Sequence, residues 1–307
     1  MIRILATDGM DASAVDKLTS LGFEVVEQFF PPEQLKEAVK EFDAMVVRSA
    51  TKVRKDILDA ALETGRLKLV IRGGVGIDNI DSAYAKEHGI TVNNTPAASS
   101  ASVAELAIGH MFSMARNIGI ANATMRNGEW NKKKYEGIEL SGKTLGLIGF
   151  GRIAKETAKK AEVLGMNVLY TRRSGEDAQE ETAKFVDLDT LIKEADFISL
   201  HIPKQADRDY VIGKEEIAAM KDGVFLINTA RGGLIEEDAL CDALDAGKVS
   251  AAALDVFREE PCKNERILHH PKISMTPHIG AATKEAQMRI GGEIVQIIEA
   301  FFGEHNE

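Results

Sequence analysis

Cysteine is scarce in this chain of 307 residues, which contains only Cys241 and Cys262 and no CxxC motif. A disulfide framework or a thiolate metal site needs more cysteines at closer spacing. We therefore expect two free thiols and no metal site.

Long hydrophobic runs are also absent from the sequence. No stretch approaches the roughly 18 consecutive apolar residues that a membrane-spanning helix requires. The first ten residues, MIRILATDGM, lack the apolar core and the small-residue cleavage site of a signal peptide. We expect a cytoplasmic protein without a membrane partner.

Positive charge is in deficit, because 38 Lys and Arg residues face 48 Asp and Glu residues, for a formal net charge of −10. Nucleic acids and anionic membranes are repelled by such a balance, so no nucleic-acid partner is expected. The one dense basic run, residues 132–134, is short and is typical of a solvated loop.

Short apolar runs that alternate with amphipathic stretches dominate the sequence, a pattern typical of parallel strands joined by crossover helices. A first series of runs occupies residues 2–7, 23–28, 44–49, 67–74 and 90–94. A second series occupies residues 144–150, 167–171, 196–202, 223–229, 252–257 and 272–277. Between the series, residues 100–119 predict one long helix, and residues 284–302 predict a final helix.

The predicted fold class is α/β, with two doubly wound parallel-sheet domains, as the length also suggests. We expect a flavodoxin-like substrate-binding domain from residues 1–95 and 281–307. A Rossmann dinucleotide-binding domain, residues 96–280, is inserted into it. Two lobes joined by two chain crossings imply a cleft.

A glycine-rich turn follows the predicted strand at residues 144–148 and opens a helix, in the pattern Gly149-x-Gly151-x-x-Ala154. Gly149 permits the tight turn, Gly151 lets backbone approach a pyrophosphate, and Ala154 allows close helix–strand packing. The N-terminus of the helix favours the anion. The pattern predicts dinucleotide binding.

Three polar residues follow successive predicted strands: Arg231, Glu260 and His278. The carboxyl ends of parallel strands converge on the ligand crevice. A histidine that titrates near neutrality can exchange the hydroxyl proton during hydride transfer, and a carboxylate beside it favours the imidazolium. Arg231 would grip a carboxylate, so the set predicts a 2-hydroxy or 2-oxo acid as substrate.

The first lobe adds two strand-end loops. The glycine-rich segment 72–79 contains Gly74 and Val75, whose backbone N–H groups could hold a substrate carboxylate, although a plain turn is the alternative. Arg48 and Ser49 follow an earlier strand, and Arg48 would suit a second anionic group on the substrate.

Over essentially its whole length the chain resembles the D-isomer-specific 2-hydroxyacid dehydrogenases. The segments that carry the likeness are VVRSATKV, RGGVGIDNID, NTPAASSASVAEL, GEWNKKKYEGIELSGKTLGLIGFGRIA, INTARGGLIEEDAL, AALDVFREEP and TPHIGAATKEAQ. Within the family, RSATKV and GxELxGKTLG narrow the likeness to the phosphoglycerate dehydrogenases.

The resemblance implies Arg231 as the substrate-carboxylate clamp, His278 as the acid/base and Glu260 as its partner. It implies further substrate contacts from Gly74 and Val75, with Arg48 and Ser49 where the phosphate end of a substrate is expected. The implied cofactor contacts are Val75, Gly149, Gly151, Arg152, Ile153, Thr171, Arg172, Ile202, Thr229, Asp255, His278 and Gly280. Asp255 is expected near the nicotinamide amide, with a strand-end cap as the alternative.

One segment departs from the family pattern. Many members place Asp at the end of the second nucleotide-domain strand, where its carboxylate accepts a hydrogen bond from the ribose 2′-hydroxyl. Here Thr171 is followed by Arg172, Arg173 and Ser174, and the acids Glu176 and Asp177 come later. Either arginine could pair with a 2′-phosphate, and a guanidinium can equally stack on adenine in an NAD site, so NAD and NADP both stay open as cofactors.

The expected reaction is hydride transfer between C2 of 3-phospho-D-glycerate and the nicotinamide, the entry step of serine biosynthesis. A hydroxypyruvate or glyoxylate reductase of the same family is the alternative enzyme. A non-catalytic dinucleotide-sensing scaffold is the alternative from another class. The resemblance further implies a homodimer through the nucleotide-binding domain, and no serine feedback is expected because the sequence stops shortly after the last predicted helix.

Overall fold

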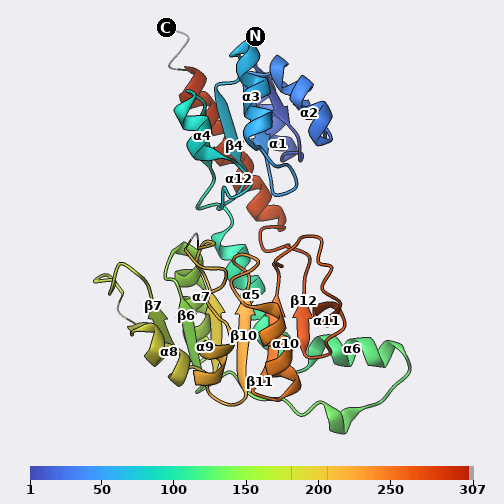
Figure 1. Ribbon diagram of the computed structural model, residues 1–307, viewed down its shortest axis with the longest axis vertical. Helices are drawn as coiled ribbons and strands as arrows, with labels where there is room; N and C mark the ends of the chain where they lie inside the picture. Colours follow the sequence, from blue (N-terminus) through green and yellow to red (C-terminus); the bar gives the residue numbers. More distant parts are fainter. Residues whose placement is uncertain (181, 206, 304–307) are drawn as a thin grey trace. The chain divides into compact units, whose positions relative to one another are not determined.

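The computed structural model describes residues 1–180, 182–205 and 207–303 (Figure 1). The chain divides into two compact units, one of Met1–Ser99 with Ala281–Glu307 and one of Ser100–Gly280. Residues 96–99 thus belong to the first unit, since Ala98 is buried in its core and its carbonyl accepts a hydrogen bond from Arg289 Nε at 2.8 Å.

The first unit is a five-stranded parallel sheet in the order β2-β1-β3-β4-β5. Its strands are β1 (Arg3–Ala6), β2 (Glu24–Glu27), β3 (Ala44–Val47), β4 (Leu69–Arg72) and β5 (Thr91–Asn94). Its helices are α1 (Ala12–Ser20), α2 (Pro32–Ala38), the 3₁₀ turn η1 (Val39–Glu41), α3 (Lys55–Thr64), α4 (Ser82–Glu87) and α12 (Lys284–Gly303). In this order the chain reverses direction across the sheet between β1 and β3, the topological switch point where ligands bind in doubly wound sheets.

Alternating side chains of these buried strands feed two cores, one on each face of the sheet. Leu5, Met45 and Val70 pack with Ile57 and Leu58 of α3. Ile4, Val46 and Ile71, one position away on the same strands, pack instead against α1 and α12.

The second unit is a seven-stranded parallel sheet in the order β12-β11-β10-β9-β6-β7-β8. Its strands are β6 (Thr144–Ile148), β7 (Asn167–Thr171), β8 (Lys184–Phe185), β9 (Phe197–Leu200), β10 (Val224–Asn228), β11 (Val249–Leu254) and β12 (Ile273–Met275). Its helices are α5 (Ser100–Ala115), α6 (Ile118–Arg126), η2 (Lys132–Lys134), α7 (Arg152–Val163), α8 (Leu188–Glu194), α9 (Lys214–Ala219), α10 (Glu237–Asp245) and α11 (Glu265–Leu268). The switch point lies between β6 and β9, as in a Rossmann fold.

Both predicted doubly wound sheets are confirmed, and so is the α/β fold class. Helices α5 and α7 cover one face of the larger sheet, and α8, α9 and α10 cover the other (Figure 1). The two-residue strand β8 at the sheet edge was not predicted, because it is too short to form an apolar run.

The prediction of one helix over residues 100–119 is wrong. Helix α5 ends at Ala115, and Asn117 adopts a left-handed conformation with φ 55° before α6 begins at Ile118. Asparagine tolerates this region better than most residues, and the apolar pattern continues across the break, which hid it from the sequence. Among the described residues, no helix is both long and apolar enough to cross a membrane.

Candidate active site

The turn after β6 fits the predicted dinucleotide motif. Gly149 has φ 94°, and a Cβ built on it would lie 2.5 Å from the carbonyl oxygen of His201, which follows β9. Only glycine accommodates both the left-handed backbone and this close approach. Its N–H donates to the Thr171 carbonyl at 2.9 Å, which ties the turn to the end of β7.

The next residues leave room for a bound group. A Cβ built on Gly151 would meet nothing within 4 Å. Gly151 is also the N-cap of α7, which receives no side-chain capping bond, so its first N–H groups are available to an anion. Arg152 is exposed and Ile153 half-buried at this helix start, while Ala154 is fully buried.

A second polar group in this unit points to a ligand. Thr229 follows β10, and its buried Oγ1 finds no hydrogen-bond partner in the described part of the chain. Buried hydroxyls are nearly always bonded, so this one is suited to a polar group of a cofactor. Together with half-buried Ile202 after β9, the residues around Gly149 and Gly151 fit a dinucleotide.

The structure brings Glu260 and His278 together. His278 Nδ1 lies 2.8 Å from Glu260 Oε2, and Glu260 Oε1 accepts a hydrogen bond from the Phe257 N–H at 3.2 Å. Burial opposes ionisation of Glu260, but the hydrogen bond and charge of His278, the Phe257 N–H and the charge of Arg231 outweigh it and lower the pKa of this carboxyl.

An ionised Glu260 can only accept hydrogen bonds, so His278 must carry a proton on Nδ1. Nε2 is then the nitrogen that is left to exchange a proton with a ligand. The His278 side chain keeps 32% of its surface exposed, so this nitrogen can be reached. The backbone of His278 has φ 54°, an uncommon conformation for a residue other than glycine and one found most often at functional sites.

Arg231 lies in a short loop after β10 that Asn228 holds in place. Asn228 Nδ2 donates to the Arg231 carbonyl at 2.8 Å, and its Oδ1 accepts the Ala230 N–H at 3.1 Å. The Arg231 guanidinium in turn donates to the Ala230 carbonyl at 2.6 Å. The charge of Arg231 acts on Glu260, which places the guanidinium in the electrostatic neighbourhood of the His278 pair.

Asp255 fixes the backbone that follows His278. Its carboxylate, only 1% exposed, accepts hydrogen bonds from Ile279 N–H, Gly280 N–H and Thr276 Oγ1 at 2.8, 2.9 and 2.6 Å. Asp255 therefore acts as a cap for three donors, which is the alternative that the sequence left open. His110 of α5 extends the network, with Nε2 at 3.0 Å from Thr276 Oγ1.

In the first unit, Asp8 fixes the loop that carries Arg48. Its carboxylate accepts the Arg48 N–H at 2.6 Å, the Thr51 N–H at 3.1 Å and the Thr51 hydroxyl at 2.7 Å. Asn79 Nδ2 donates to the carbonyls of Arg48 and Thr51, each at 2.7 Å. Asp8 follows β1 and Arg48 follows β3, so the loop stands at the switch point of this sheet. Ser49 is exposed on the same loop.

The glycine-rich loop after β4 contains Gly74 in a backbone conformation that other residues rarely adopt. Its φ is 142°, so a side chain at this position would strain the backbone. No described residue accepts a hydrogen bond from the N–H of Gly74 or Val75. The loop is held by its carbonyls instead, from Thr95 N–H to Gly74 and from Asn94 Nδ2 to Val75.

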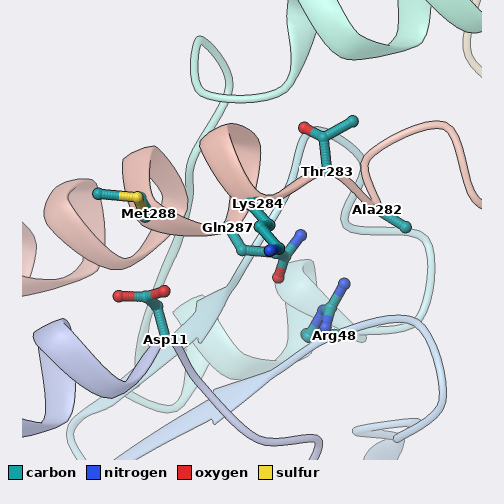
Figure 2. Close-up of a pocket in the computed structure, with 7 residues that line it drawn as sticks. All are labelled: Asp11, Arg48, Ala282, Thr283, Lys284, Gln287 and Met288. Carbon is teal, nitrogen blue, oxygen red and sulfur yellow. The ribbon is translucent and has the colours of Figure 1, made fainter.

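Arg48 lines a pocket of about 460 Å³ within the first unit (Figure 2). The other lining residues are Asp11, Ala282, Thr283, Lys284, Gln287 and Met288, most of them at the start of α12. Figure 2 shows the Arg48 guanidinium beneath the side chains of Lys284 and Gln287. The pocket therefore combines two cationic side chains with one carboxylate.

The comparisons with known proteins agree with this geometry. Residues 108–280 match the model of the D-isomer specific 2-hydroxyacid dehydrogenase, NAD binding domain. Hydroxypyruvate reductase from Thermotoga maritima is 47% identical over 303 residues, covering 96% of this chain and 97% of that protein. The chain belongs to the D-isomer-specific 2-hydroxyacid dehydrogenase family.

Relatives within this family carry more than one name. D-3-phosphoglycerate dehydrogenase from Methanocaldococcus jannaschii is 45% identical over 304 residues, covering 97% of this chain but 57% of that protein. The crystal structure of a glyoxylate reductase from Paecilomyes thermophila has a TM-score of 0.88 at 32% identity, covering 97% of this chain and 95% of that one. The chain spans about half the length of the curated phosphoglycerate dehydrogenases it matches.

Family membership confirms two predictions. The chain is an oxidoreductase of the kind that acts on CH–OH donors, and its relatives act on small hydroxy or oxo acids. It carries the family's NAD-binding domain. Among the described residues, no group of three or more His, Cys, Asp or Glu side chains could hold a metal ion.

Some residues that shape the site were not predicted from the sequence. Asp8 and Asn79 hold the Arg48 loop, Asn228 holds the Arg231 loop, and His110 and Thr276 support Asp255. All act through contacts between segments that lie far apart in the sequence or with backbone, and such contacts leave no local sequence motif. The exposed lysines of η2, residues 132–134, line none of the pockets described above.

Proposed function

We propose that this family member interconverts 3-phospho-D-glycerate and 3-phosphohydroxypyruvate, the entry step of serine biosynthesis. The observation that carries the proposal is the pocket of Arg48 and Lys284 at the switch point of the first sheet. With its carboxylate held by Arg231, an unphosphorylated acid has no second anionic group for these two cations, whereas a phosphate dianion matches both.

The acid/base role falls to His278. In the oxidative direction its Nε2 takes the C2 hydroxyl proton while the bond between C2 and its hydrogen breaks. The imidazolium that forms is stabilised by the Glu260 carboxylate at 2.8 Å. A nicotinamide held by the second unit would supply the acceptor for the hydride that leaves C2. In the reductive direction His278 returns the proton to the carbonyl oxygen.

The remaining residues bind and orient. Arg231 holds the substrate carboxylate, a task that suits its planar guanidinium. The free N–H groups of Gly74 and Val75 assist with the same group, and Ser49 assists Arg48 at the phosphate. Gly149, Gly151, Arg152, Ile153, Thr171, Arg172, Ile202, Thr229, Asp255 and Gly280 are the proposed cofactor contacts, together with Val75 and His278.

Hydroxypyruvate reduction is the second candidate. It is favoured by the 47% identical hydroxypyruvate reductase, which this chain matches over nearly its whole length. The two candidates differ only in whether the substrate carries a phosphate, so the Arg48 pocket separates them.

The test is reduction of 3-phosphohydroxypyruvate, hydroxypyruvate and glyoxylate by the wild type and by the variants Arg48→Ala and Lys284→Met. We expect the phosphorylated acid to be the best substrate, and both variants to raise its KM about tenfold or more without affecting hydroxypyruvate. Lys17→Met removes an exposed lysine elsewhere in the first unit and is the matched control. A preference for hydroxypyruvate that survives both variants would assign the chain to the reductases.

We also propose a homodimer formed by the second unit. Several large apolar side chains are exposed in the last turn of α5 and in the segment from there to β6, among them Phe112, Ile118, Met125, Trp130 and Ile138. Trp130 is 80% exposed, and such a set is more typical of an interface than of a free surface. Sedimentation equilibrium of the wild type and of Trp130→Glu with Met125→Glu tests it, and a monomeric wild type would rule it out.

A further inference from the structure

In a doubly wound fold, the loop after the second strand of the nucleotide-binding half, here β7, borders the ribose of the nucleotide. The charges of this loop therefore favour or oppose the binding of a 2′-phosphate. The loop begins with Arg172 and Arg173, a pair that by sequence alone favours binding of a 2′-phosphate. In the structure it turns back on itself. Gly175, with φ 78°, donates its N–H to the Arg172 carbonyl at 3.2 Å, and this tight turn returns Asp177 to the end of the strand.

The loop itself occupies the guanidinium of Arg172. Nε donates to the Gly175 carbonyl at 2.6 Å, Nη2 to the Glu176 carbonyl at 2.9 Å and Nη1 to Asp177 Oδ2 at 3.1 Å. Each guanidinium nitrogen therefore already has an acceptor. Three of the five guanidinium N–H groups are thus used inside the loop, and a phosphate finds only the two that remain, on a guanidinium whose charge Asp177 already offsets.

Asp177 neutralises a second cation as well. Its Oδ2 lies 2.6 Å from Lys155 Nζ, in the first turn of α7 and next to the glycine-rich turn. The carboxylate is only 14% exposed, and its backbone N–H donates to the Tyr170 hydroxyl at 2.8 Å, which fixes its position. The Lys155 hydrogen bond, with Gln179 N–H and Arg172, lowers the pKa of this carboxyl, so it is ionised at neutral pH.

Arg173, by contrast, contributes little at this position. Its side chain is 78% exposed, and its nearest acidic partner in the described part of the chain is Asp207 Oδ1 at 3.7 Å. A solvated arginine of this kind holds a ligand weakly unless other groups orient it.

We propose that Asp177 selects NAD(H) against NADP(H), by pairing with Lys155 and Arg172 and by placing its own negative charge in the loop that borders the ribose. It takes over the selective role of the strand-end acid that the sequence lacks, from a position further along the chain. This inference rests on the NAD-binding domain and not on the identity of the substrate.

The experiment is a titration of the protein with NADH and with NADPH, followed by nicotinamide fluorescence and by calorimetry, in the absence of substrate. We expect the wild type to bind NADH about tenfold or more tightly than NADPH. In Asp177→Asn, which frees both cations, NADPH binding should tighten about tenfold relative to NADH. Failure of the substrate proposal leaves this readout untouched, because no turnover is measured.

Glu176→Gln is the matched control, since it removes the same charge one position away while the Glu176 carbonyl still accepts from Arg172. It should change the NADH to NADPH ratio by less than about twofold. If Asp177→Asn melts early, Lys155→Gln tests the same pairing, and it should weaken NADPH further while sparing NADH. A wild type that prefers NADPH, an unchanged ratio in Asp177→Asn, an equal shift in Glu176→Gln, or tighter NADPH binding in Lys155→Gln would each overturn the proposal.

Discussion

Asp8 in the first unit and Asp255 in the second hold functional loops by the same chemistry. Each carboxylate follows a strand and accepts two backbone N–H groups and one threonine hydroxyl, from Arg48 and Thr51 in one case and from Ile279, Gly280 and Thr276 in the other. Within the described residues, neither carboxylate has a cation as its hydrogen-bond partner. The loops are therefore placed by hydrogen bonds with defined directions, which fix position better than an ion pair does.

The two loop-holding carboxylates, Asp8 and Asp255, here called the clamps, differ in burial and in the loop that each one holds. Asp255 is 1% exposed and adjoins His278, the proposed acid/base, whereas Asp8 is only half-buried and adjoins Arg48, the proposed binding group. A group that exchanges a proton must be placed more accurately than one that holds an anion through long-range charge. The more buried carboxylate, Asp255, therefore holds the loop whose position must be more accurate.

The largest effect should come from the proposed acid/base. Replacing His278 by Gln keeps a polar side chain but removes the proton exchange, and kcat should fall by about 10² to 10⁴. Steady-state kinetics in both directions measure it. His88→Gln, an exposed histidine of the first unit, is the control and should leave kcat unchanged. An active His278→Gln variant would show that the loop held by Asp255 is not catalytic, and the contrast with the loop held by Asp8 would then fail.

Removing each carboxylate compares the clamps directly. Asp255→Ala leaves three donors without an acceptor, the Gly280 N–H buried and the other two part-buried, and the free energy of unfolding should fall by about 3 kcal/mol or more. Asp8→Ala should cost about 1 to 2 kcal/mol, because the Asp8 side chain is only half-buried and all three of its hydrogen bonds are part-buried. Denaturant unfolding measures both, and equal losses would show that burial does not distinguish the clamps.

Removing the threonine hydroxyls sharpens the comparison. Thr276→Val breaks the bonds to Asp255 and to His110, while Thr51→Val breaks only the bond to Asp8. We expect losses of about 2 and about 1 kcal/mol in the free energy of unfolding. The first variant should also lower kcat, and the second should raise KM. The reverse assignment of these kinetic effects would contradict the proposed roles of the loops.

The smallest effect concerns pH. The pKa of Glu260 is lower in the folded state than its ordinary value of 4.5, so its contribution is fully present above that pH and is lost as the pH falls toward the folded pKa. The side chain is 38% exposed, which screens the effect to below about 1 kcal/mol. Between pH 6 and a pH below 4, the free energy of unfolding should fall less for Glu260→Gln than for the wild type. Identical falls in the two proteins would contradict a stabilising role for the Glu260 charge.

The sequence predicted the sheets because alternating apolar and amphipathic runs report which segments are buried, and the glycine motif because Gly149 has no alternative to glycine. It also placed Glu260 and His278 at neighbouring strand ends. It could not reveal the clamps, because Asp8 and Asp255 act on backbone that lies far away in sequence. The sequence could not show whether the Arg172 guanidinium is available to a ligand either. That depends on the turn at Gly175, which brings Asp177 beside it.

Four polar side chains beside Asp255, namely His110, Ser113, Ser274 and Thr276, form a strip that fixes the register of helix α5. His110 also contacts Ser274 Oγ through Nδ1 at 3.0 Å, and that serine reaches Ser113 at 3.2 Å, so the strip runs along the contact between α5 and β12. Helix α5 is apolar on most of its surface, and hydrophobic packing alone would let it rotate or slide at little cost. Burial lowers the pKa of His110 and keeps the ring neutral. The hydrogen bonds between the imidazole and its hydroxyl partners have defined directions, so they form in only one rotational position of the helix.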